Sequence, residues 1–246
     1  DLYDEILIKK IKNKDHKIKF IGKCAGNIYS NNTVSKLLKI VEKEKLLSNI
    51  KFKIIIKKNI PSKAGLGGGS MNAACILKFL IKKRLIKVTK KDVNRISNLV
   101  GSDVILGMYS KNLILKSNNI IQNFNIKKKL HTLIVKPNFG CSTKKIYSGV
   151  KYFGKAKFNK SNINFFNIDF LKRFNNDLEL IAFKKYPKLD NLKKYLENLT
   201  RVEFVRMTGS GSAIIAYFKS NKMCKQAEKK VKNHFRNYWC KSSKTI

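Results

Sequence analysis

Acidic residues are scarce in this chain of 246 residues, in which 54 lysines and arginines outnumber 15 aspartates and glutamates. A formal net charge of +39 is typical of nucleic-acid-binding proteins, because clustered cations release counterions from a phosphate backbone. Here, however, the lysines are spread from end to end in small groups such as Lys127–Lys129, among many isoleucines and asparagines. This pattern favours a solvated basic surface that attracts anionic small molecules, and no nucleic-acid partner is expected.

The chain also lacks the patterns of metal-binding, disulfide-bonded and membrane-spanning proteins. Its five cysteines are scattered, with no CxxC pair and no histidine at metal-ligand spacing, so the metal ligands stay unknown and reduced thiols are predicted. No apolar run approaches the roughly 18 residues of a membrane helix, and no segment resembles a signal peptide. We therefore expect a cytoplasmic protein with no membrane partner.

Proline is rare, with three residues, so no proline-rich linker marks a domain boundary. Hydrophobic residues make up 43% of the chain, which is enough for real cores. Helical and strand-like segments are mixed without a regular βαβ repeat, including strands predicted around Leu106 to Leu115, and this mixture indicates an α+β protein. The polar stretch Ile120–Lys129 separates two strands, and it suggests two domains, 1–125 and 126–246.

The most informative segment is a glycine-rich loop, Pro61–Ala74, which runs from a predicted strand into a predicted helix over Asn72–Ile86 with Ser70 as its N-cap. Consecutive glycines let an anion approach the backbone, and a helix N-terminus offers unpaired N–H groups. The loop is neither a Walker A motif nor a Rossmann fingerprint, and a glycine run used only as a turn is the alternative. The residues predicted to bind ATP and its phosphates are Pro61, Ala64, Gly65, Leu66, Gly67, Gly68, Gly69, Ser70 and Asn72.

This loop resembles the second motif of the GHMP kinase superfamily, Pro-x-x-x-Gly-Leu-Gly-Ser-Ser-Ala. Further segments resemble family motifs in the expected order: Asn31–Val34, Gly101–Val104, Asn176–Glu179 and Arg206–Ala213. The resemblance covers nearly the whole chain. It implies a two-domain α+β fold, with an N-terminal domain similar to ribosomal protein S5 domain 2 and a ferredoxin-like C-terminal domain, and it implies ATP and Mg²⁺ as cofactors.

The triple glycine followed by Ser-x-Asn-Ala-Ala is most similar to the branch of the superfamily that phosphorylates a cytidyl diphosphate-linked polyol for isoprenoid synthesis. The resemblance implies that Asp103 is the general base that activates the acceptor hydroxyl. Asp103 precedes the apolar segment Val104–Leu106, so we expect the carboxylate to be desolvated. Taken alone, a Gly-Ser-Asp triplet is also compatible with a simple turn or helix cap.

Contacts to the substrate are expected from Thr143, Tyr147, Gly209, Ser210 and Gly211. The resemblance places an aromatic ring near the start of the C-terminal domain, where cytosine stacks, and Tyr147 matches it; a core tyrosine is an equally good interpretation. The turn Gly209–Gly211 is expected to brace the glycine-rich loop Pro61–Ala74 or to border the substrate phosphates. A methionine replaces the family's second serine, so we expect Mg²⁺ to be held mainly by phosphates and water.

Two other functions stay open. One is another small-alcohol kinase, of the homoserine or mevalonate type, and the other is a non-enzymatic basic RNA-binding module. Family members begin with a strand carrying Lys-Leu/Ile-Asn followed by Gly-Tyr-His, and this chain begins at Asp1 without them. We therefore expect that an N-terminal segment is missing and that the chain as given has little activity; the oligomeric state is left open.

Overall fold

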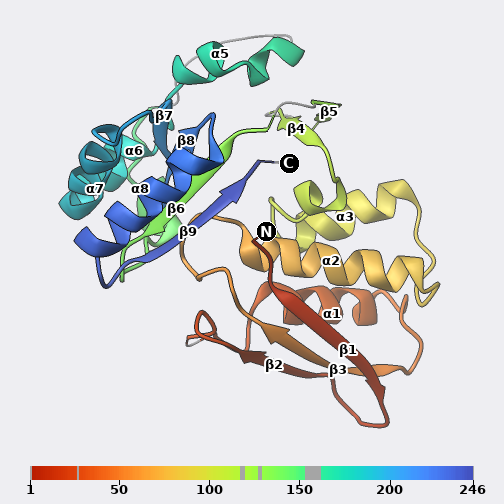
Figure 1. Ribbon diagram of the computed structural model, residues 1–246. Helices are drawn as coiled ribbons and strands as arrows, with labels where there is room; N and C mark the ends of the chain where they lie inside the picture. The colour runs from red at the N-terminus through yellow and green to blue at the C-terminus, as the bar shows by residue number, and fades with distance from the viewer. Residues whose placement is uncertain (1, 27, 117–119, 127–128, 153–161, 246) are drawn as a thin grey trace. The chain divides into compact units, whose positions relative to one another are not determined.

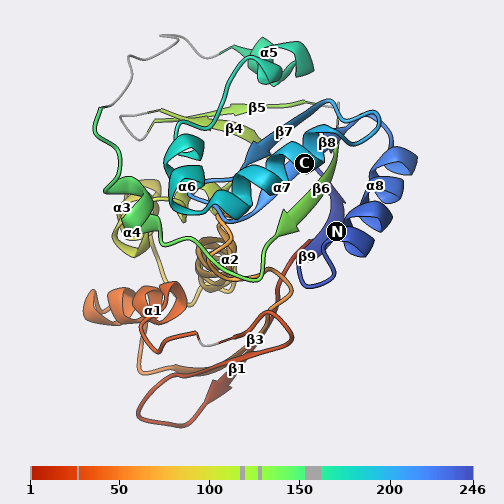
Figure 2. The same cartoon turned by 90° about the vertical axis from the view of Figure 1, so that its left-hand side faces the viewer.

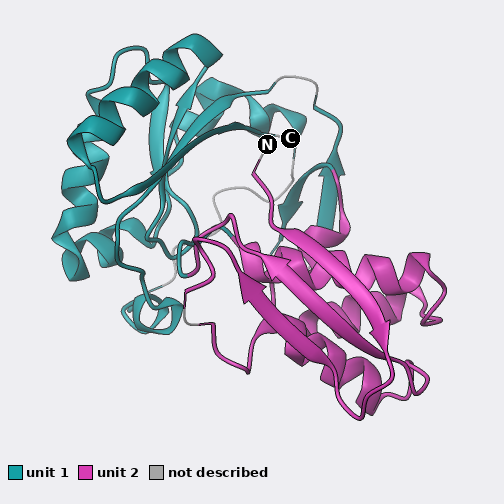
Figure 3. Ribbon diagram, turned by 60° about the horizontal axis from the view of Figure 1, so that its bottom comes forward, with its two compact units in different colours: residues 1, 63–66, 111–246 teal, residues 2–62, 67–110 magenta. Residues whose placement is uncertain are grey.

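The fold is that of a computed structural model, in which residues 2–26, 28–116, 120–126, 129–152 and 162–245 are described. The chain divides into two compact units, drawn in different colours in Figure 3. Unit 1 comprises residues 63–66 and 111–246 together with residue 1, and unit 2 comprises residues 2–62 and 67–110. Part of the predicted boundary stretch, Lys127 and Lys128, lies outside the described residues. The predicted domain limits stay a prediction.

Unit 2 is one sheet with helices along one side (Figure 1). Its strands are β1 (Glu5–Ile11), β2 (Lys17–Ile21) and β3 (Lys51–Lys57), in the order β1-β3-β2, with β3 antiparallel to β1 and parallel to β2. Its helices are α1 (Thr33–Lys43), α2 (Gly68–Lys82), α3 (Lys90–Val100) and the 3-10 helix η1 (Ile105–Met108).

The core of unit 2 follows from simple periodicity. Along β3, Phe52, Ile54 and Ile56 are buried, while the alternating lysines are not, as expected where one face of a strand covers a core. On α2, Ala73 and Leu77 are four residues apart and therefore lie on the same face, which packs into this core. The sheet and the first turns of α2 are thereby joined in one hydrophobic cluster.

Unit 1 is built on a four-stranded antiparallel sheet (Figure 2). Its strands are β6 (His131–Lys136), β7 (Phe204–Met207), β8 (Ile214–Phe218) and β9 (Trp239–Lys244), in the order β7-β8-β6-β9. A hairpin of β4 (Asn112–Leu115) and β5 (Ile121–Phe124) belongs to the same unit. Its helices are α4 (Thr143–Tyr147), η2 (Ile163–Phe166), α5 (Ile168–Lys172), α6 (Glu179–Lys185), α7 (Pro187–Glu197) and α8 (Asn221–His234).

Two sequence-based expectations about local structure are wrong. The helix after the glycine loop begins at Gly68 rather than Asn72, and Gly67, at φ 66°, takes the N-cap position expected for Ser70. A strand expected around Leu106 is instead the 3-10 helix η1. Across the described residues, the structure contains no helix that is both long and apolar enough to cross a membrane.

Candidate active site

The first turn of α2 is open to an anion. The first intrahelical bond runs from the Met71 N–H to the Gly67 carbonyl, at 2.9 Å, so the N–H groups of Gly68, Gly69 and Ser70 precede the helical ladder. A Cβ built on Gly67 would meet no atom of the described residues within 4 Å. Such N–H groups at the positive end of a helix dipole are suited to bind phosphate.

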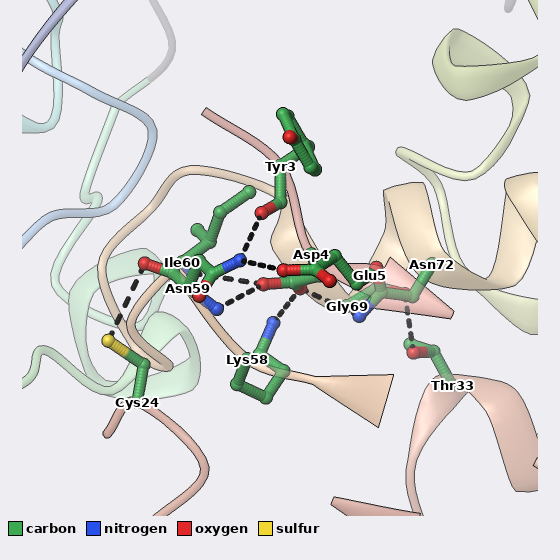
Figure 4. Close-up of polar contacts among 10 residues, drawn as sticks. All are labelled: Tyr3, Asp4, Glu5, Cys24, Thr33, Lys58, Asn59, Ile60, Gly69 and Asn72. Atoms are coloured by element: carbon green, nitrogen blue, oxygen red, sulfur yellow. Dashed lines mark hydrogen bonds and ion pairs between the residues drawn. The ribbon is translucent and has the colours of Figure 1, made fainter. Parts of the chain in front are cut away.

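The two glycines that follow lie close to neighbouring side chains. A Cβ on Gly68 would lie 3.0 Å from Cγ2 of Ile60, and one on Gly69 would lie 3.2 Å from Oγ1 of Thr33. Thr33, the first residue of α1, donates its hydroxyl to the Gly69 carbonyl at 2.8 Å (Figure 4). The backbone of this turn is therefore held by direct contact with α1 and with the end of β3.

A buried ion pair ties the same turn to the sheet (Figure 4). The Asp4 side chain is 0% exposed, and that of Lys58, with which it pairs, is 4% exposed. Oδ1 of Asp4 accepts the backbone N–H groups of Asn59 (2.8 Å) and Ile60 (2.9 Å), while Oδ2 accepts Lys58 Nζ and, at 2.9 Å, Asn72 Nδ2. Burial by itself raises the pKa of Asp4, but these hydrogen bonds outweigh it and lower the pKa below its ordinary value.

This network was not anticipated from the sequence. Asp4 and Lys58 are 54 residues apart, and neither lies in a recognisable motif. Asn72, which was predicted to bind phosphate, is buried and donates its amide to the Asp4 carboxylate instead of pointing away from the sheet. Its predicted role as a phosphate ligand stays a prediction.

Asp103 lies between α3 and η1, and its side chain is exposed. The expected desolvation is wrong, because Val104 and Ile105 turn into the core and do not cover the carboxylate. Its Oδ1 lies 3.2 Å from the hydroxyl of Ser102. An exposed carboxylate is accessible to a substrate hydroxyl, as a general base must be.

The segment that carries Asp103 is packed against α2. A Cβ on Gly107 of η1 would lie 2.6 Å from Cβ of Ala74 and 3.0 Å from Sδ of Met71. Glycine at this position therefore permits η1 to approach the first turns of α2 closely. The segment that carries Asp103 and the start of α2 are consequently held together within unit 2 by the packing of η1 on α2.

The first half of the glycine loop, Lys63–Leu66, is braced within unit 1 by the segment Arg206–Ala213. The Ala213 N–H donates to the Ala64 carbonyl at 3.0 Å, and the Thr208 hydroxyl donates to the Gly65 carbonyl at 3.0 Å. A Cβ on Gly65 would lie 2.1 Å from the Thr208 carbonyl oxygen, which excludes any other residue without rearrangement. These hydrogen bonds come from Thr208 and Ala213, on either side of Gly209–Gly211, and the roles expected for those three residues stay predictions.

The predicted substrate residues of unit 1 come together on two neighbouring segments. Thr143 Oγ1 and Ser210 Oγ are 2.9 Å apart, and Ser210 lies between Gly209 and Gly211, which have left-handed φ values of 52° and 83°. Tyr147 follows Thr143 by four residues on α4 and so lies on the same helix face. Its ring is 54% exposed, so it is not a core tyrosine.

The remaining predicted site residues are divided between the units. Leu66 belongs to unit 1 with Ala64 and Gly65, and it is half-buried. Pro61 and Ser70, which are also half-buried, belong to unit 2. Within the described part of the chain, no group of three or more His, Cys, Asp or Glu side chains could hold a metal ion.

Comparison with known proteins identifies the family. Residues 32–111 match the family of GHMP kinases N terminal domains, and residues 161–237 match GHMP kinases C terminal. The chain belongs to the GHMP kinase superfamily. It is 53% identical to 4-diphosphocytidyl-2-C-methyl-D-erythritol kinase of Pelagibacter ubique, across 100% of this chain and 88% of that protein. The kinase of the same name from Petrotoga mobilis is 34% identical, across 78% of this chain and 77% of its own length.

Solved GHMP kinases share the fold. A crystal structure of 4-(cytidine 5'-diphospho)-2C-methyl-D-erythritol kinase gives a TM-score of 0.73 at 19% identity, covering 97% of this chain and 85% of that one. A crystal structure of homoserine kinase from Cytophaga hutchinsonii gives a TM-score of 0.72 at 16% identity, covering 99% of this chain and 85% of that one. The two-domain α+β GHMP kinase fold predicted from the sequence is confirmed. The nearly equal scores leave the distinction between substrates to sequence identity.

Proposed function

We propose that this GHMP kinase transfers the γ-phosphoryl group of ATP to the 2-hydroxyl of 4-diphosphocytidyl-2-C-methyl-D-erythritol, hereafter the cytidyl substrate. The observation that carries the proposal is the 53% identity, along the whole chain, to a kinase of that name. The alternative functions, a homoserine kinase or a mevalonate kinase, are supported only by the shared fold. The fold alone does not determine which substrate is phosphorylated.

The nucleotide phosphates bind at the first turn of α2 in this proposal. The N–H groups of Gly68, Gly69 and Ser70 donate to phosphate oxygens, and the space beside Gly67 admits them. Mg²⁺, when bound, neutralises charge on the transferring phosphoryl group. The hydroxyl of half-buried Ser70 and the exposed carboxylate of Asp103 are oxygen ligands of the kind that Mg²⁺ prefers, which supports its use as a cofactor.

Asp103 acts as the general base. One of its carboxylate oxygens accepts the proton of the substrate hydroxyl as that oxygen forms its bond to the γ-phosphorus and the bond to the ADP oxygen breaks. The exposure of Asp103 and the packing of η1 on α2 through Gly107 support this assignment. Because the phosphoryl transition state is loose, positioning contributes more to the rate than base strength.

The cytidyl end of the substrate is bound by unit 1 in this proposal. The exposed Tyr147 ring provides a stacking surface for cytosine, and the paired hydroxyls of Thr143 and Ser210 provide hydrogen bonds to the substrate. We further infer that the protein functions in the cytoplasm, since no two of its five cysteines form a disulfide among the described residues.

The proposal is tested by initial rates of ADP formation with ATP, Mg²⁺ and the cytidyl substrate. Asp103→Asn should lower kcat by roughly 10²–10⁴-fold, as expected on removal of a general base. Asp92→Asn is the matched control, because it removes the same charge from another place in unit 2. Asp92 lies in the first turn of α3, where its carboxylate accepts the backbone N–H of the N-cap residue Thr89. An Asp103→Asn enzyme with unchanged kcat would contradict the assignment of the base.

A further inference from the structure

The two oxygens of the Asp4 carboxylate accept hydrogen bonds from different kinds of donor. Oδ1 accepts only backbone N–H groups, those of Asn59 and Ile60 at the end of β3. Oδ2 accepts only side-chain donors, Lys58 Nζ and the Asn72 amide. One oxygen therefore fixes the chain that enters the glycine loop, and the other reaches α2, the helix that leaves it (Figure 4). A single buried side chain spans both ends of the loop within unit 2.

The contact with α2 is made at the turn that carries the phosphate-binding N–H groups. Asn72 follows Gly68 by four residues, so both lie on one face of α2, and Gly68 contacts Ile60 on that face. The Asn72–Asp4 hydrogen bond and the Thr33–Gly69 hydrogen bond hold two different sides of this turn. Together they fix the direction in which the N–H groups of Gly68, Gly69 and Ser70 point.

Stability alone does not explain this arrangement. A buried ion pair loses hydration on both ions, and an apolar replacement of similar shape is often as stable. Four donors converging on one buried carboxylate instead define a single geometry, in which each donor has its own lone pair. Such a fully satisfied network rigidifies the backbone that it touches.

We propose that Asp4 is a positioning residue for nucleotide binding, which acts through Asn72 to orient the first turn of α2. This inference rests on the proposed function, because it takes that turn as the ATP site. It assigns to Asn72 a role as a link between Asp4 and the turn, rather than as a ligand of phosphate.

The first test is Asn72→Ala, which removes the contact with α2 and leaves the Asp4–Lys58 pair in place. We expect KM for ATP to rise about tenfold, which corresponds to about 1.4 kcal/mol, with KM for the cytidyl substrate unchanged. Glu42→Gln is the matched control, because Glu42 pairs with Lys51 at the opposite end of β3. The control should leave KM for ATP unchanged.

The second test restores the contact with its polarity reversed. Asp4→Asn keeps an oxygen for the two backbone N–H groups but turns an NH₂ group toward Lys58 and Asn72, so KM for ATP should rise. Adding Asn72→Asp supplies a carboxylate that accepts from the new amide and from Lys58. The double variant should recover most of the ATP affinity that Asp4→Asn loses.

The outcomes separate the inference from the proposed function. If the unmodified chain phosphorylates the cytidyl substrate but Asn72→Ala keeps its KM for ATP, the inference is wrong and the function stands. Fully additive effects of Asp4→Asn and Asn72→Ala would also overturn it, because residues acting in one link are not additive. If the unmodified chain prefers homoserine or mevalonate to the cytidyl substrate, the proposed function fails, and calorimetric titration with ATP decides the inference by the same tenfold criterion.

Discussion

Gly65 and Gly67 lie two residues apart in one loop, and both adopt left-handed backbone, at φ 72° and 66°. A Cβ on Gly65 would lie 2.1 Å from the Thr208 carbonyl oxygen, whereas a Cβ on Gly67 would meet no described atom within 4 Å. The first glycine is needed for packing within unit 1, and the second leaves space beside an unpaired helix terminus. A glycine motif therefore combines two requirements that the sequence alone does not distinguish.

The two glycine turns are also held by different chemistry. In unit 2 the first turn of α2 is tied by the charged Asp4 through Asn72. In unit 1 the turn at Gly209 is tied by a neutral side chain, since the Asn176 amide donates to the carbonyls of Met207 (2.9 Å) and Gly209 (2.6 Å). The arrangement in unit 2 is therefore expected to respond to acid through Asp4.

The largest effect is expected from Gly65→Ala. The added methyl group would overlap backbone atoms of Thr208, so we predict a loss of about 4 kcal/mol in the free energy of unfolding of unit 1, in the range of severe steric substitutions. Urea unfolding monitored by tryptophan fluorescence measures this loss, because Trp239 on β9 reports on unit 1. An unchanged midpoint would show that the loop is not packed as described.

Gly67→Ala should give the opposite pattern. The methyl group enters open space, so the free energy of unfolding should fall only by the strain of a left-handed alanine, about 1–2 kcal/mol. It should exclude a phosphate oxygen from the turn, and loss of one charged hydrogen bond weakens ATP binding by about 1.5–3 kcal/mol. Titration with ATP measures the affinity; unchanged affinity would mean that this space does not receive phosphate.

Tyr147→Ala extends the comparison to the substrate. An exposed stacking ring acts on the base that it covers, so binding of the cytidyl substrate should weaken by about 2 kcal/mol while ATP affinity is unchanged. Tyr186→Ala is the control, because that ring stacks on Phe139 at 5.6 Å and packs against the core. The control should lower thermal stability without selective loss of substrate binding, and equal behaviour of the two variants would mark Tyr147 as structural.

The smallest effect concerns pH. Because the pKa of Asp4 is lower in the folded chain than in the unfolded chain, its stabilising contribution is complete above the unfolded pKa and is lost as pH falls through the folded pKa. The difference in unfolding free energy between the unmodified chain and Asp4→Asn should therefore narrow below about pH 4. Urea unfolding of both proteins at pH 7 and pH 3 measures this difference in unfolding free energy. A difference that is the same at both pH values would mean that the Asp4 carboxylate is not held ionised.

Local patterns predicted some of these elements well and others poorly. The apolar alternation of Lys17–Ile21 favours a strand and the capping residues before Lys90–Val100 favour a helix, and the structure shows both. β9 was not predicted, because its last four residues, Lys241–Lys244, are polar and show no apolar alternation. At the glycine loop, Ser70 is a better intrinsic N-cap than Gly67, but in the structure Gly67 is the N-cap and Gly68 the first helical residue.

The residues of the candidate site likewise divide into those that local sequence patterns predicted and those that they did not. Asp103 and the glycine turns lie in short motifs, so the sequence identified them. The Asp4 network depends on β1 and β3 being paired, and a contact across 54 residues has no local signature. The exposure of Asp103 was likewise missed, because apolar neighbours in sequence turned toward the core rather than over the carboxylate.

One measurement tests the central claim most directly. The chain is incubated with ATP, Mg²⁺ and equal concentrations of 4-diphosphocytidyl-2-C-methyl-D-erythritol, homoserine and mevalonate, and the phosphorylated products are quantified by mass spectrometry. The account predicts that the cytidyl product forms with a kcat/KM at least roughly a thousandfold above those of the other two, since a site that hydrogen-bonds its substrate rejects those lacking the partner groups. Preferential phosphorylation of homoserine or mevalonate would contradict it.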